Sequence, residues 1–176
     1  MPKKKKAKGK KAGFLPFLPL AFSLPGVVAS ILGLILPFAS RLTKSPYTGK
    51  IDREVKTLSE WGRLHDASRE VGGRGFVSFS PARGLAWTVA ISAALVLFLL
   101  VLSRVYPRSK DLIWTTAVAG VLTAFASVVF FIFAVFFAVS AGSDSVRVIL
   151  SAAPFCTLGG GIVSGASAFF AVRRDL

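Results

Sequence analysis

Ionisable side chains are missing from the long apolar runs of this sequence. The runs at 12–40, 84–103, 112–142 and 148–172 contain no Asp, Glu, Lys, Arg or His. Each run reaches the roughly 20 apolar residues that a helix needs to cross a bilayer, so the chain is expected to be a polytopic membrane protein. Proton pathways and ion-coupled transporters commonly place ionisable groups inside the membrane, and such functions are therefore disfavoured.

Cysteine and histidine are also scarce. The one cysteine, Cys156, lies in the last apolar run, so no disulfide can form within the chain. The one histidine, His65, lies in a charged segment and is expected to be exposed or interfacial. Haem and most metal sites favour an imidazole, and catalysis needs a nucleophile beside a base or a pair of carboxylates. We therefore expect no metal, no cofactor and no enzyme activity.

The apolar runs predict an all-α membrane protein with four transmembrane helices. The expected organisation is a basic tail at 1–13, a proline-rich first segment at 14–42, a loop at 43–83, spans at 84–106, 112–140 and 146–172, and a basic C-terminus at 173–176. Within the loop, 52–71 predicts a short amphipathic interfacial helix. Acidic residues begin it, Trp61 lies on its apolar side and Gly72-Gly73 ends it, whereas 75–81 is expected to be extended.

The first segment has two interpretations because it contains several prolines. In one, Ser23 caps a transmembrane helix that has Pro25 in its first turn and runs to about Leu42. In the other, the Pro25-Gly26 turn divides the segment into a re-entrant hairpin, followed by three spans. Four spans place 12 Lys and Arg on the N-terminal side and 10 on the other, whereas the hairpin gives 17 and 5. Charge therefore favours the hairpin, but segment length favours four spans, which we adopt.

The N-terminal tail carries seven lysines within eleven residues. Such a tail suits anionic lipid headgroups or a partner, at about 1 kcal/mol per basic residue near the surface. It equally suits a role in orientation alone, with the N-terminus on the cytoplasmic or equivalent inside face. Nucleic acid is not expected as a partner, because the rest of the chain is apolar. The predicted contacts are Lys3, Lys4, Lys5, Lys6, Lys8, Lys10 and Lys11.

Small residues in the last run predict a helix-packing surface. Gly161 and Gly165 form a GxxxG motif, which lets helix backbones approach closely in lipid. The full predicted set is Gly161, Gly165, Gly160, Ser164, Gly120 and Gly26. We favour contacts within the chain, since a four-helix bundle needs such seams, and keep a homo-oligomer as the alternative. Phe130, Phe133 and Phe137 form a separate stripe that is predicted to face lipid or a partner subunit.

The overall layout resembles four-span claudin-like proteins, including their fungal cortical relatives. The shared features are a long first loop, short second and third loops and a basic C-terminus, and they cover the whole chain. Trp61-Gly62 is similar to part of the W-GLW-C-C signature of claudin first loops, but this loop has no cysteine. The resemblance implies a tetraspan protein that forms or modulates a pore or channel.

The sequence favours a non-catalytic accessory or scaffolding subunit that packs against partner transmembrane helices in a larger membrane complex. The claudin-like pore or channel modulator is the alternative. A pore needs a water-lined path, so a closed bundle without a polar lumen favours the accessory role.

Overall fold

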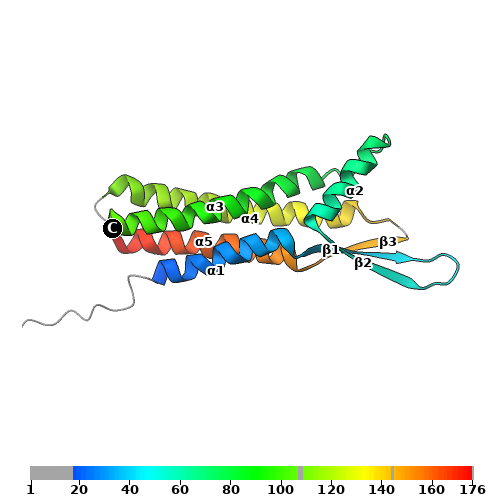
Figure 1. Cartoon of the computed structure of the whole chain (residues 1–176), viewed down its shortest axis with the longest axis horizontal. Coiled ribbons are helices and arrows are strands. Elements are labelled where there is room, and N and C mark those ends of the chain that lie inside the picture. Colours follow the sequence, from blue (N-terminus) through cyan, green and yellow to red (C-terminus); the bar gives the residue numbers. More distant parts are fainter. Residues whose placement is uncertain (1–17, 107–108, 144, 176) are drawn as a thin grey trace, which may run out of the picture.

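Four long helices run side by side, and a small sheet and a short helix stand at one end of them (Figure 1). The computed structural model describes residues 18–106, 109–143 and 145–175. The elements are α1 (Leu18–Ile35), β1 (Pro37–Lys44), β2 (Ile51–Thr57), α2 (Leu58–Glu70), α3 (Phe79–Val105), α4 (Lys110–Ser140), β3 (Val146–Leu150) and α5 (Ala152–Asp175). We call β1, β2, β3 and α2 the cap. Helices α1, α3, α4 and α5 are each long and apolar enough to span a membrane.

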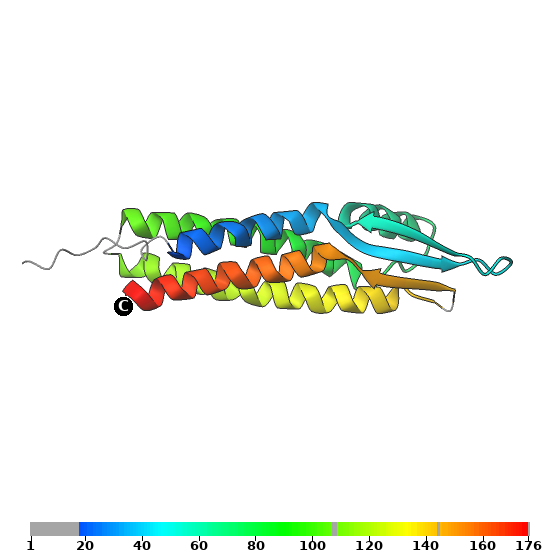
Figure 2. The ribbon, with the colours of Figure 1, turned by 90° about the horizontal axis from the view of Figure 1, so that it is seen from below.

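The chain passes along the bundle four times. Helix α1 begins and α5 ends at the same end of the bundle, which we call the terminal end, and the cap lies at the other (Figure 2). Helix α1 continues unbroken through Pro25 and Gly26, so the re-entrant hairpin is wrong. The expected extent of this helix is also wrong, since it begins at Leu18 and ends at Ile35. It ends there because Pro37 lacks a backbone donor and restricts the residue before it.

The all-α prediction is corrected by a three-stranded sheet of order β2-β1-β3. Both pairings are antiparallel, and Leu42 of β1 lies opposite Arg53 of β2 and Arg147 of β3. Strand β1 had been assigned to the first span and β3 to the fourth. Short apolar strands that continue a longer apolar run cannot be distinguished from helix by hydropathy alone.

The helix of the first loop is shorter than expected. Residues 52–57 belong to β2, and α2 begins only at Leu58, because Thr57 is its N-cap. The Glu60 amide donates to the Thr57 hydroxyl (3.4 Å), and the Glu60 carboxylate accepts from the Thr57 amide (2.6 Å), which is a capping box. Helix α3 begins at Phe79, so the extended segment expected at 75–81 is wrong from residue 79 onward.

The buried side of α4 differs from the prediction. Its buried residues are Ile113, Thr116, Gly120, Thr123, Ser127, Phe130, Ala134 and Phe137. Phe130 and Phe137 are fully buried and Phe133 is half-buried, so the predicted lipid or partner face is wrong. Phe130 and Phe137 continue a stripe of small and hydroxyl side chains on α4. The members of this stripe are three or four residues apart and face the bundle interior rather than lipid.

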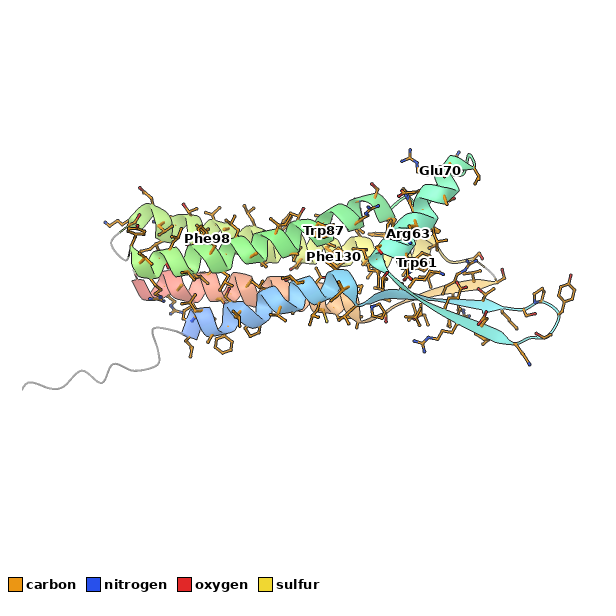
Figure 3. The ribbon with its side chains drawn as sticks, in the orientation of Figure 1. Trp61, Arg63, Glu70, Trp87, Phe98 and Phe130 are labelled. Carbon is orange, nitrogen blue, oxygen red and sulfur yellow. The ribbon has the colours of Figure 1, made fainter. Side chains whose placement is uncertain are left out.

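Aromatic rings join the cap to the bundle. The ring centroid of Phe137 (α4) lies 5.0 Å from that of Trp61 (α2), 5.4 Å from Phe38 (β1) and 5.3 Å from Phe79 (α3). Trp61 is buried, and its indole Nε1 donates a hydrogen bond to the Ala39 carbonyl oxygen (3.3 Å). Figure 3 places Trp61 at this junction and Trp87 along α3. The cap is therefore packed onto the helices rather than tethered by loops.

We predict that Trp61→Ala lowers the free energy of unfolding by about 3–5 kcal/mol, because a fully packed indole leaves a cavity. Trp87→Ala is the control, since the Trp87 side chain is 54% exposed. Thermal denaturation in detergent should show a clear loss for Trp61→Ala, and amide exchange in β1 should accelerate. Equal, small effects of both substitutions would contradict the packed junction.

Candidate interaction surfaces

Helix α5 packs on α1 through a row of small residues that includes Gly160 and Ser164. A methyl carbon placed on Gly160 would lie 2.6 Å from the Gly26 carbonyl oxygen, closer than real contacts allow. One placed on Gly26 would lie 2.5 Å from the Ser164 hydroxyl oxygen. Close backbone approach provides the van der Waals contact on which helix association in lipid depends.

A second row of small residues packs α5 on α4. A methyl carbon on Gly165 would lie 2.6 Å from the Gly120 carbonyl oxygen, and one on Gly161 would overlap Ser127. The six residues predicted for helix packing are all buried between helices of this chain. These six positions are therefore not available for packing against a helix of another chain.

An apolar groove of about 610 Å³ lies between α1 and α3 near the cap. Its lining, which defines the α1/α3 groove, is Ile31, Leu34, Ile35, Thr57, Ser59, Trp87, Ala90, Ile91 and Ala94. The alanines of the lining, Ala90 and Ala94, have short side chains, so part of the α3 side of the groove projects little. Thr57 and Ser59 belong to the cap and lie at one end of the groove. The groove is thus an apolar surface between two helices, at the level where the bundle meets the cap.

The sheet has an exposed outer face that combines basic and apolar side chains. Alternation and register place Leu42, Lys44, Ile51, Arg53, Val55, Arg147 and Ile149 on this face. The strand carboxylates, Asp52 and Glu54, alternate to the opposite face. Among the described strand residues, the outer sheet face thus carries three cations and no anion.

Three acidic groups of the cap, Glu54, Glu60 and Asp66, have local partners. The Lys56 ammonium lies 2.9 Å from the Glu54 carboxylate, and its hydrogen bond and charge lower the pKa of Glu54. Hydrogen bonds from the Thr57 amide and hydroxyl lower the pKa of Glu60. Asp66 lies 3.6 Å from Arg83. These contacts organise the cap.

His65 is buried, which corrects the expectation of an exposed residue. Its ring centroid lies 5.7 Å from that of Phe79, and its Nδ1 lies 3.2 Å from the Asp66 carboxylate. Amphipathic periodicity could have indicated this position, because His65 follows Trp61 by four residues on one helix side. Over the described ranges, no three side chains of His, Cys, Asp or Glu come together in a way that could hold a metal ion.

The lysines of the predicted lipid contact, residues 3–11, lie outside the described residues. A scan against protein-family models and a search of curated proteins both found no match. The surfaces of the chain itself are thus the basis for inferring function.

We predict that Gly160→Leu and Gly161→Leu each lower stability by about 1–3 kcal/mol or more, because the new side chain meets backbone or a neighbouring helix. Gly159→Leu is the matched control on the same helix, since a methyl carbon there would have nothing within 4 Å. The control should be neutral or slightly stabilising, because leucine favours helix more than glycine does. Detergent melting temperatures that fall equally for all three would contradict the packing of α5.

Proposed function

We propose that this protein is a non-catalytic integral membrane scaffold that packs against the transmembrane helix of a partner subunit. The observation that carries the proposal is the α1/α3 groove, which is apolar and has alanines along part of its α3 side. The groove lies beside the cap, which is packed on the bundle. Small residues let a further helix approach closely, which is what association in lipid requires. The cap then provides a fixed surface beside the bound helix.

Orientation follows from charge. The sequence before α1, around the connection of α3 to α4 and at the end of the chain holds 12 Lys and Arg, and the sequence around the two remaining connections holds 10. We place the N-terminus on the cytoplasmic or equivalent inside face, since basic residues beside the spans favour that side. The outer sheet face would then meet a partner on the opposite side of the membrane.

A claudin-like pore or channel modulator is the second candidate, and the outer sheet face favours it. Among the described residues, the buried hydroxyls of Ser30, Thr123 and Thr157 donate to carbonyls of their own helices, which disfavours a water path through the bundle. A pore would therefore form between copies of the chain, with the cationic sheets beside the path. Recordings from protein reconstituted in planar bilayers distinguish this candidate, since a scaffold gives no conductance.

The groove is tested by filling it. Ala94 is exposed in the α1/α3 groove, so Ala94→Trp should occupy the groove without disturbing the core. Val128→Trp is the control, since Val128 is exposed on α4 outside the groove. We predict that Ala94→Trp lowers partner recovery in mild detergent at least about tenfold, equivalent to 1.4 kcal/mol, while Val128→Trp retains it.

A photo-crosslinking residue at Ile91, in the groove, should give a discrete protein adduct in native membranes, whereas one at Val128 should not. Melting temperatures of the two tryptophan variants should match that of the wild type. Unchanged partner recovery in Ala94→Trp, together with no adduct at Ile91, would overturn the scaffold proposal.

A further inference from the structure

A second groove, of about 570 Å³, lies between α4 and α5 near the terminal end. Trp114, Val118, Val121 and Leu122 of α4 and Phe169 and Arg173 of α5 are among its lining residues, and we call it the α4/α5 groove. It lies between a different pair of helices from the α1/α3 groove and toward the opposite end of the bundle. It is therefore independent of the surface on which the proposed function rests.

The α4/α5 groove is apolar along its length and cationic at its terminal end. Arg173 lines this end and is exposed. Lys110 is exposed and precedes Trp114 by four residues, which places it on the same side of α4, one turn nearer the terminal end. Asp111 is the carboxylate nearest to Lys110 in sequence, but it lies about 100° further round the helix.

The other large apolar grooves lack this feature. No ionisable side chain lines the α1/α3 groove. The groove between α1 and α5, which includes Leu18, Phe22, Val163 and Phe170, also has none among its described lining residues. A cation at the end of an apolar slot is thus specific to the α4/α5 groove among these three.

We propose that the α4/α5 groove binds one anionic phospholipid from the leaflet at the terminal end. An acyl chain lies along Val118, Val121 and Phe169, and the headgroup phosphate meets Arg173 and Lys110. Arginine binds phosphate through paired hydrogen bonds, and lysine adds a point charge. Trp114 lies at the depth where indoles favour the membrane interface.

Charge and shape together select this occupant. A soluble phosphate would meet the cations but leave the apolar lining unused. An apolar partner helix would fill the slot but offer no anion to Arg173. A phospholipid satisfies both ends, and a basic site between helices is an established way to hold an anionic headgroup.

Native mass spectrometry of the full chain tests the site with phosphatidylglycerol and phosphatidylcholine of identical acyl chains. The wild type should retain one phosphatidylglycerol in preference to phosphatidylcholine. The double variant Lys110→Gln/Arg173→Gln should weaken phosphatidylglycerol binding about 10- to 30-fold, since each basic residue contributes about fivefold near an anionic surface. Its phosphatidylcholine binding should be unchanged.

Two further variants separate headgroup, chain and general charge effects. Val121→Trp fills the groove and should weaken the binding of both lipids. Arg63→Gln/Arg69→Gln removes the same charge from exposed positions of α2 and should change the binding of neither lipid. Glycerol phosphate should not displace the bound lipid. Helical content checks folding. The site would be overturned if either Lys110→Gln/Arg173→Gln or Val121→Trp bound phosphatidylglycerol as tightly as the wild type does. Displacement of the bound lipid by glycerol phosphate would also overturn it.

Discussion

The ring of Phe137 is surrounded by aromatic rings from the cap and from α3. Trp61, Phe38, Phe76 and Phe79 have their centroids 5.0, 5.4, 5.5 and 5.3 Å from that of Phe137. Edge-to-face and tilted ring pairs at such distances add to the free energy that burial alone supplies. Strand β1, α2 and α3 all depend on this cluster for their positions relative to α4. The sheet is consequently held in a defined orientation at the end of the bundle, and the proposed function requires such an orientation.

The lipid environment explains the rest of the interior. Lipid offers no water, so helices there gain from close contact rather than from the hydrophobic effect. Gly26, Gly120, Gly160 and Gly165 meet neighbouring backbones, and Thr123 donates to the Ala119 carbonyl oxygen of its own helix. The glycine contacts lie between α5 and α1 and between α5 and α4. The long apolar side chains are left for the outer surface, where the two grooves provide separate places for the proposed partner helix and the proposed lipid.

Hydropathy predicted four membrane-length helices because uncharged runs leave few other structures possible in lipid. It could not predict β1 or β3, since their apolar residues extend runs that also form helices. Two clues were present but unused: the Thr57–Glu60 capping pattern marks the start of α2, and the row from Thr116 to Phe137 marks the inner side of α4. The α1/α3 groove could not be predicted from the sequence, because Ile31 of α1 and Ala90 of α3 come together only through tertiary packing. The cations of the outer sheet face likewise depend on strand register.

The aromatic junction implies that the cap and the bundle move as one body. The test is the distance between spin labels at Arg69→Cys on α2 and Val105→Cys at the far end of α3, in a Cys156→Ser background, measured by pulsed electron–electron double resonance in lipid nanodiscs. Both positions are exposed, so the labels should not disturb packing. The structure predicts a single, narrow distance distribution. A broad or multiple distribution would show that the cap moves independently of the helices and would contradict the account.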